Sequence, residues 1–389
     1  MDCHLPDETD ETSFFPLRLG VASGSVARFR YGASLLACPL LRVNSIVDSD
    51  VRRMRTWANT FGKETHVFSN LKEMTESQLP PNVVILDAPL GDRPQAIESL
   101  LDTGVCLGII SPPPFTPTLE ETDELLRRAK ESGTLLFPGL NRRYDPIFAQ
   151  ALELAKSGVI GVMKQMRCDW SFPLTHLLGI ELGADLAADH WNDLLPYIMT
   201  QAIESCRRCF GEVLSVSADI DTFEPTPGND SRKPADTAHL LATVLLTHSE
   251  GSCSCHFSRS RSVQSNERYI FFGDKGSLEL IVSSNSHESS WLPLLILHMN
   301  GQRPQPIPPP ASYFPEDEAA SIRNIGLLNH FAESVSIFCE NGVQDREARM
   351  IQEAVQAAYL SVEEKRKVAL PLRRTISHRS RLKEFMNDR

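Results

Sequence analysis

The sequence lacks any apolar run that could cross a membrane, and it lacks an excess of positive charge. No stretch approaches the roughly eighteen apolar residues that a membrane helix needs. Its formal net charge of −11 disfavours nonspecific attraction to nucleic acid or to anionic lipid. The acidic N-terminus has no apolar core, so we expect no secretory signal. We therefore expect a cytoplasmic protein with neither a membrane nor a nucleic acid as its partner.

Cysteine pairs with the tight spacing of structural zinc sites are also missing, although the chain has nine cysteines. Cys206, Cys209, Cys253 and Cys255 could together supply four thiolate ligands. Alternatively, the first two lie in a helical pattern and the last two alternate along a strand, where they pack as small hydrophobic side chains. We favour the packing interpretation, which predicts no metal site. In the absence of an export signal, it also predicts reduced thiols.

The length of 389 residues is too great for one ordinary hydrophobic core, so we expect two domains. Changes in pattern divide the chain into four parts. Residues 1–16 are predicted to be a flexible acidic tail, and residues 373–389 a basic tail. Residues 17–141 and 142–372 are predicted to be the two domains.

The first domain alternates short apolar runs with helical patterns, which is typical of a Rossmann-type, doubly wound parallel sheet in an α/β fold. The predicted strands are 17–22, 41–47, 83–88, 105–110 and 135–138. The predicted helices are 51–61, 93–103 and 119–132.

The second domain begins with a predicted helix at 147–156 and continues mainly with segments that alternate apolar and polar residues. This pattern predicts an α+β domain with a mostly antiparallel open sheet. The predicted strands are 162–172, 213–220, 238–247, 251–258, 268–272 and 277–282. The proline-rich segment 302–310 is predicted to be an extended surface loop.

A candidate phosphate-binding turn follows the first predicted strand. A dinucleotide-binding fold has glycines there because the chain turns tightly and its N–H groups approach the pyrophosphate. Here Ala22, Gly24, Ser25 and Val26 form the candidate cofactor-binding segment, with Ala27 in the last small-residue position. Only the middle glycine of the pattern is present, so an ordinary strand, turn and helix would also explain the segment.

The second predicted strand ends at Asp48, twenty-four residues after Gly24. An acidic residue near this point in such folds accepts hydrogen bonds from the adenosine ribose, and it repels the 2′-phosphate of NADP. Asp48 therefore predicts NAD as the cofactor, with NADP disfavoured. The alternative is that Asp48 is a turn residue that caps the helix from Val51.

Several blocks in the same order resemble the Gfo/Idh/MocA family of nicotinamide-dependent sugar and polyol oxidoreductases. The resemblance spans residues 17–372 and implies an NAD(P)-dependent enzyme that acts on CH–OH groups of a sugar-like or cyclic polyol. It also implies homo-oligomers that form through the open sheet of the second domain. The blocks that carry it are 47–62, 141–146, 268–280 and 359–361.

The resemblance also implies functional residues. The family has Thr-Pro-Asn after the fourth strand and a histidine shortly afterwards. In this chain the proline is retained as Pro89, and Arg93 stands in place of the histidine. Arg93 could bind a phosphate or a carboxylate, or it could be an exposed arginine at the start of a helix. Within the block 141–146, Arg143 and Tyr144 are the candidate substrate contacts.

The catalytic block of the family is altered in this chain. Its Glu-Lys-Pro lysine, which serves catalysis, is replaced by Pro113. The family histidine aligns with His190, and Asp193 lies one helical turn later, where it can orient the imidazole. An isolated pair of this kind is more often a surface ion pair. Pro196 predicts a kink or an early end of this helix.

Three functions are consistent with this sequence. The first is an oxidoreductase with a divergent site, in which His190 acts as the acid and base; this is the class that we assign. The second is a catalytically inactive relative that binds or senses a ligand, because losing a positioned proton-transfer group typically costs a factor of roughly 100 to 10,000 in rate. The third is an oligomeric scaffold.

Overall fold

The computed structural model describes residues 15–22, 24–173, 184–223, 239–260, 265–284, 294–310, 316–341 and 346–372. Within these ranges, only the backbone is described at some positions, including residues 24–30 and 184–194. The two predicted tails lie outside the description, apart from residues 15 and 16. The chain forms two compact units, residues 1–141 with 321–350, and residues 142–320 with 351–389.

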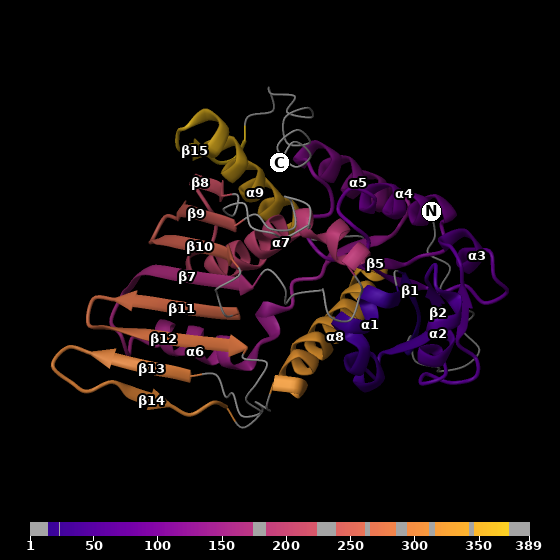
Figure 1. The fold of residues 1–389 in the computed structure, drawn as a ribbon, viewed down its shortest axis with the longest axis horizontal. Coiled ribbons are helices and arrows are strands. Elements are labelled where there is room, and N and C mark those ends of the chain that lie inside the picture. The colour runs from indigo at the N-terminus through magenta and orange to yellow at the C-terminus, as the bar shows by residue number, and fades with distance from the viewer. Residues whose placement is uncertain are drawn as a thin grey trace, which may run out of the picture. The chain divides into compact units, whose positions relative to one another are not determined.

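The first unit contains a six-stranded, fully parallel sheet in the order β3-β2-β1-β4-β5-β6 (Figure 1). This confirms the predicted Rossmann-type architecture. The strands are β1 (Leu17–Ala22), β2 (Leu41–Val47), β3 (His66–Phe68), β4 (Val83–Leu86), β5 (Gly108–Ser111) and β6 (Leu135–Pro138). The helices between them are α1 (Gly24–Ala37), α2 (Val51–Ala58), α3 (Leu71–Thr75), α4 (Arg93–Thr103) and α5 (Leu119–Glu131).

The strands of this sheet are buried as their apolar residues predict. All four residues of β4, of β5 and of β6 are buried, as expected for strands of a parallel sheet that is covered on both faces. Local caps fix where the helices start. Thr118, for example, accepts a hydrogen bond from the backbone N–H of Glu121 and so begins α5.

Helix α8 (Glu316–Asn341) joins the first unit from residue 321 onwards, although the sequence division placed it in the second domain. Its apolar face packs on the end of the sheet, where Phe331 lies 5.5 Å from Phe137 between ring centroids. Gly108 allows the closest approach, because a Cβ atom there would lie 2.6 Å from Cγ2 of Val335. Packing with the first unit therefore recruits a segment that is distant in sequence.

The second unit contains a nine-stranded sheet in the order β14-β13-β12-β11-β7-β10-β9-β8-β15. Neighbouring strands are antiparallel except β7 and β10, which confirms the mostly antiparallel sheet. The strands are β7 (Met163–Pro173), β8 (Ser215–Phe223), β9 (His239–Thr247), β10 (Ser252–Ser260), β11 (Ser265–Gly273), β12 (Gly276–Ser284), β13 (Leu294–Met299), β14 (Gln305–Ile307) and β15 (Val368–Ala369).

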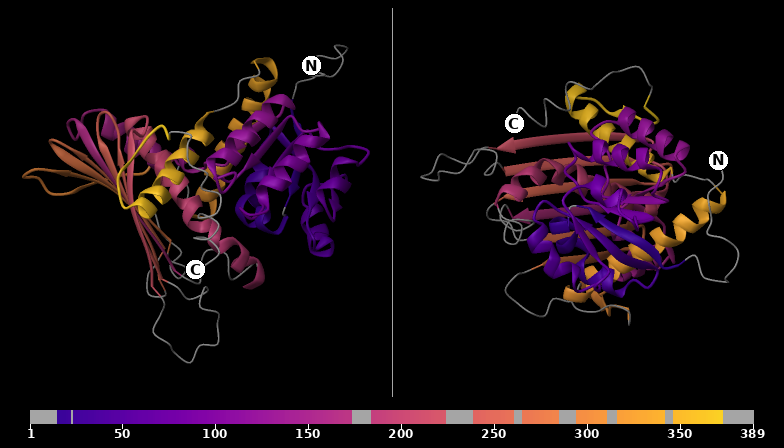
Figure 2. Two further views of the ribbon diagram at one scale, coloured as in Figure 1. Left: turned by 90° about the horizontal axis from the view of Figure 1, so that it is seen from above. Right: turned by 90° about the vertical axis from the view of Figure 1, so that its right-hand side faces the viewer.

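Helices of the second unit cover one face of this sheet (Figure 2). They are α6 (Pro146–Lys156), α7 (Ala184–Phe210) and α9 (Glu347–Glu364), the last belonging to this unit from residue 351, and a short 3-10 turn, η1 (Arg142–Tyr144), precedes α6. No helix among the described residues is long and apolar enough to span a bilayer.

Two local predictions for the second unit need correction. The early end of the helix at Pro196 is wrong, since α7 has 27 residues and includes Pro196; packing of its buried residues on the sheet outweighs the one backbone hydrogen bond that proline removes. The predicted loop at 302–310 contains the short strand β14. Its proline, Pro306, is tolerated because β14 lies at the edge of the sheet.

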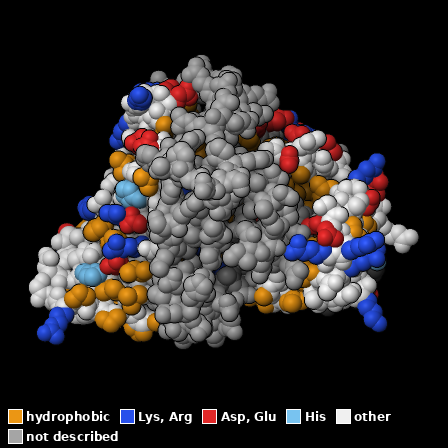
Figure 3. Space-filling view, in the orientation of Figure 1, with side chains coloured by type: hydrophobic (Ala, Val, Ile, Leu, Met, Phe, Trp, Pro, Cys, Tyr) orange, Lys and Arg blue, Asp and Glu red, His pale blue; other side chains and the backbone are white. Residues whose placement is uncertain are grey.

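The other face of the sheet exposes apolar side chains on β9. Ala242, Val244 and Leu246 are buried, whereas Leu241 and Leu245 are 52% and 48% exposed. Figure 3 shows hydrophobic side chains among charged ones over the strands of this unit. The exposed apolar side chains on β9 agree with the predicted self-association through the open sheet, which stays a prediction.

We expect that replacing Gly108 with valine destabilises the first unit by about 1–3 kcal/mol, because the new side chain overlaps Val335 of α8. Urea-induced unfolding, followed by circular dichroism, measures the change. The control is Gly32→Ala in α1. A Cβ atom there meets nothing within 4 Å, and the substitution should raise stability by up to about 1 kcal/mol. Equal stability of Gly108→Val and the wild type would contradict the packing of α8 on β5.

Candidate functional site

The candidate site lies at the carboxyl edge of the parallel sheet, beside β1. From there the strand order continues to β2 and β3 on one side and to β4, β5 and β6 on the other. Strand β1 is paired with β2 on one side and with β4 on the other. The order β3-β2-β1-β4-β5-β6 therefore reverses between β1 and β4. In open parallel sheets, ligands bind outside the strand ends at such a switch point. The turns after β1, β2, β4 and β5 all meet this edge.

The first of these turns connects β1 directly to α1. Ala22 ends β1, is 2% exposed, and pairs with Val47 and with Leu86. Helix α1 begins at Gly24, and its first turn contains no acidic residue. The side chains of Ser25 and Val26 lie outside the described residues. The N-terminus of this 14-residue helix follows the central strand, which is the arrangement that binds a pyrophosphate in dinucleotide folds.

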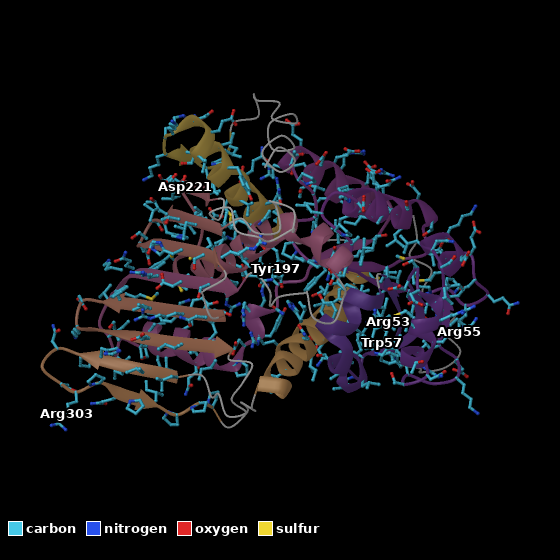
Figure 4. The ribbon with its side chains drawn as sticks, in the orientation of Figure 1. Arg53, Arg55, Trp57, Tyr197, Asp221 and Arg303 are labelled. Atoms are coloured by element: carbon cyan, nitrogen blue, oxygen red, sulfur yellow. The ribbon has the colours of Figure 1, made fainter. Side chains whose placement is uncertain are left out.

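Asp48 follows β2, next to β1 at the same edge. Its side chain accepts a hydrogen bond from the N–H of Asp50 at 2.9 Å, and Asp50 in turn accepts one from the N–H of Arg53. Asp50 is thus the cap of α2, while Asp48 shapes the turn before it. Figure 4 shows Arg53 and Arg55 on α2, and both side chains are exposed.

Arg93 is buried, with only 4% of its surface exposed. The sequence-based alternative of an exposed arginine at a helix start is therefore wrong. Its Nε and Nη2 donate to the carbonyl of Ala88 at 3.0 and 2.7 Å. Its Nη1 donates to the carbonyls of Pro112 and Pro114 at 3.1 and 2.5 Å. One guanidinium thus ties the turn after β4 to the turn after β5.

The turn after β4 also contains Pro89, the retained proline. Its carbonyl accepts hydrogen bonds from the N–H groups of Asp92 and Arg93 at 3.0 and 2.8 Å, which starts α4. Pro89 itself is half-buried. The sequence analysis missed a buried acidic residue here, Asp87, which is 1% exposed at the end of β4. An acidic residue that ends an apolar strand is the signal that could have identified it.

The turn after β5 replaces the lysine of the resembled family. Pro113 is buried between the two prolines whose carbonyls bind Arg93, and the Pro113–Pro114 peptide bond is cis. Just before it, the hydroxyl of Ser111 donates to the carbonyl of Leu86 at 2.8 Å. This edge therefore has a proline turn at the position that the resemblance aligns with the family lysine.

In the second unit, the candidate substrate contacts Arg143 and Tyr144 lie on η1, and Tyr144 is half-buried. The guanidinium of Arg143 donates to the carboxylate of Glu204 on α7 at 2.6 Å, and the Glu204 side chain is 1% exposed. This pair fixes the direction of the Arg143 side chain.

The adjacent Arg142 forms a buried network. It pairs with Glu267, and its guanidinium carbon lies 5.4 Å from the ring centroid of Trp170. Burial raises the pKa of the Glu267 carboxyl, and the charge of Arg142 opposes that rise. The hydroxyl of Tyr269 also donates to Glu267. These partners give Arg142 a structural role in the core of the second unit.

His190 and Asp193 belong to α7, but their side chains lie outside the described residues. Their proposed pairing stays a prediction.

Comparison with known proteins gives matches at the level of family and fold. Residues 19–140 match the model of the Gfo/Idh/MocA oxidoreductase family, described as having an NAD-binding Rossmann fold. An uncharacterized oxidoreductase of Schizosaccharomyces pombe is 24% identical over 226 residues, which cover 54% of this chain and 55% of that protein. The chain thus spans little more than half the length of that relative.

Two solved structures share the fold of both units. An oxidoreductase from Agrobacterium radiobacter in complex with NAD+, L-tartaric acid and magnesium has a TM-score of 0.68 and 15% identity, over 91% of this chain and 98% of that one. A 3-ketoreductase from Actinomadura kijaniata in complex with TDP-benzene and NADP has a TM-score of 0.64 and 18% identity, over 89% of this chain and 98% of that one. Together with the parallel sheet and its switch point, these matches show that residues 19–140 are similar to the Gfo/Idh/MocA oxidoreductase family and that the chain shares the fold of the two solved oxidoreductases.

Proposed function

We propose that this protein is a nicotinamide-dependent oxidoreductase that acts on a CH–OH group of a sugar-like or cyclic polyol. The observation that carries the proposal is the switch point of the parallel sheet, where the start of α1 and Asp48 meet the end of β1. The match of residues 19–140 to the Gfo/Idh/MocA family model supports the same reaction class.

The residues at this edge fit a dinucleotide. The start of α1 after Ala22 offers backbone N–H groups and the positive end of a helix to a pyrophosphate. We assign to Asp48 the role of accepting hydrogen bonds from the adenosine ribose, and this role would favour NAD over NADP. The exposed Arg53 and Arg55 on the next helix are the feature that would favour NADP instead. When bound, the coenzyme would supply the hydride acceptor or donor.

We assign the other two roles, proton transfer and substrate contact, to residues of the second unit. We assign proton transfer to His190, with Asp193 orienting the imidazole, because a group near neutrality suits the loss or gain of a hydroxyl proton. We assign substrate contact to Arg143 and Tyr144. The pairing of Arg143 with Glu204 supports this role, because a side chain held by a buried carboxylate is already oriented for binding.

One observation favours a second function, that of an inactive relative which binds or senses a ligand. Pro113 stands where the family has its catalytic lysine, and the hydrogen bonds of Arg93 to the flanking carbonyls hold that turn in place. A turn so fixed has no ammonium group to stabilise a developing oxyanion. The chain would then retain coenzyme or ligand binding without turnover.

Coenzyme binding tests the first requirement of the proposal. Titration of the purified protein with NADH and with NADPH, followed by coenzyme fluorescence, should show saturable binding and a preference for NADH. The Asp48→Ala variant should shift the ratio of the two affinities towards NADPH by roughly tenfold, or about 1.4 kcal/mol, because the carboxylate no longer bonds the ribose or repels a 2′-phosphate.

Asp50→Asn is the matched control for this experiment. It removes a charge two residues away but keeps the helix cap, since asparagine caps as well as aspartate does. Its preference should equal that of the wild type. If neither coenzyme binds at millimolar concentration, the oxidoreductase proposal is wrong.

Turnover separates the two functions. On a panel of polyols and sugars, we expect His190→Asn to lower kcat by roughly 100-fold to 10,000-fold while coenzyme affinity is unchanged. His256→Asn, which alters a histidine on β10, serves as the control. Pro113→Lys should raise the rate if the site is a degenerate catalytic one. Wild-type protein that binds coenzyme, with no turnover in either the wild type or Pro113→Lys, would favour the ligand-binding function.

The contacts of Arg93 predict a large effect on stability. Arg93→Ala should lower the melting temperature markedly, because each buried carbonyl left without a donor costs about 1–3 kcal/mol. Arg93→Lys should recover only part of the loss, since one ammonium cannot reach all three carbonyls. Arg127→Ala removes an exposed arginine with two surface ion pairs and should leave the melting temperature unchanged. Differential scanning fluorimetry distinguishes these results.

A further inference from the structure

A cluster of sulfur atoms lies in the core of the second unit, between the sheet and α7. Cys168 lies on β7, Cys253 and Cys255 lie on β10, and Cys206 and Cys209 lie on α7. The register of β7 and β10 places Cys168 beside Cys255. Alternation along β10 gives Cys253 and Cys255 the same face, and α7 packs against that strand and against β7. Strand pairing and helix packing thus bring together thiols from three elements.

Three of these thiols have the spacing of a metal site. The Sγ atoms of Cys168, Cys206 and Cys255 all lie within 4.8 Å of one another, and the three residues are 0% exposed. The Sγ atoms of Cys206 and Cys255 are 3.6 Å apart. Zinc–sulfur bonds of about 2.3 Å in a tetrahedron separate neighbouring sulfurs by about 3.8 Å. The observed separation is therefore close to one edge of such a tetrahedron.

A fourth donor is adjacent. Cys253 is 1% exposed and its thiol interacts with that of Cys206, although it is not one of the three converging thiols. Zinc in structural sites has four ligands, and a set of four cysteines is one of its usual combinations. Within the described part of the chain, Cys168, Cys206 and Cys255 are the one group of three or more candidate metal-binding side chains whose ligand atoms converge.

We propose that the second unit binds one structural zinc ion through Cys168, Cys206 and Cys255, with Cys253 as the fourth ligand. The ion would join α7 to the two strands beneath it. This inference does not depend on the proposed oxidoreductase function, because none of the four residues lies at the edge of the parallel sheet.

The alternative is that the thiols pack as small hydrophobic groups. Burial raises the pKa of Cys206 to about 11, and it also raises the pKa of Cys253. Without a metal the thiols are therefore neutral and can remain in the core, and metal binding has to displace their protons. Because all four are buried, the ion has to enter as the unit folds, so zinc is best supplied during synthesis.

The cluster also corrects the set of cysteines that the sequence suggested. Cys209 was one of the four candidate ligands in the sequence, but its Sγ lies 3.2 Å from Sδ of Met166. Cys168 takes its place. The sequence does not reveal this, because Cys168 joins the cluster only through the parallel pairing of β7 with β10.

Metal analysis of the full chain tests the proposal. Protein produced in zinc-supplemented medium and purified with a reductant but no chelator should contain about one zinc ion per chain by mass spectrometry of the elements. Cys206→Ala and Cys255→Ala should each retain less than about a fifth of that amount. The control is Cys106→Ala, a buried thiol of the first unit, which should retain the wild-type content.

Cobalt provides a second measurement that needs no variant. Wild-type protein produced with Co²⁺ should show the visible bands of a tetrahedral cobalt–thiolate site. If the cysteine variants fail to fold, the cobalt spectrum of the wild-type protein tests the metal site by itself. Three results would overturn the proposal: wild-type protein with neither zinc nor the cobalt bands, variants with wild-type zinc content, or a Cys206–Cys255 disulfide in freshly isolated protein. Uptake of Cu⁺ in preference to zinc would overturn the assignment of the metal.

Discussion

The hydrogen bonds of a single buried guanidinium shape the candidate coenzyme edge. Arg93 binds the carbonyl of Ala88 after β4 and the carbonyls of Pro112 and Pro114 after β5. Prolines have no N–H groups and leave their turn with carbonyls to satisfy, so a donor with several N–H groups in a plane suits this position. The two turns next to the switch point therefore depend on one side chain from the start of α4.

This constraint bears on how the chain differs from the family that it resembles. The architecture of the parallel sheet is intact, and its turns meet at the edge where dinucleotides bind. Pro113, which the resemblance aligns with the family lysine, lies in a proline turn to which Arg93 is hydrogen-bonded. A fold can keep its core and its coenzyme edge while the group that moves the proton changes, because core packing and site chemistry depend on different residues.

The core of the second unit also contains buried polar and sulfur groups that contact one another. Arg142 and Glu267 form an ion pair beneath Trp170, while Arg143 is held by Glu204. A buried charge needs a partner, since an isolated one is costly in a medium of low polarity. Such pairs fix the start of the second unit and orient the turn that carries the candidate substrate contacts. The sulfur cluster lies in the same core, between α7 and the middle of the sheet.

The sequence by itself determined the two-domain α/β architecture, because apolar periodicity and turn residues are local signals that survive in each strand and helix. It also located Ala22 at the end of one strand and Asp48 directly after the next, since a strand boundary is visible in the pattern. Tertiary structure decided the rest. Packing buries Arg93 among carbonyls of the turns after β4 and β5, and it adds α8 to the first unit. Packing also keeps α7 helical through Pro196, and strand pairing places Cys168 beside Cys255. Each of these depends on partners distant in sequence, and a local pattern holds no information about which distant residues will meet.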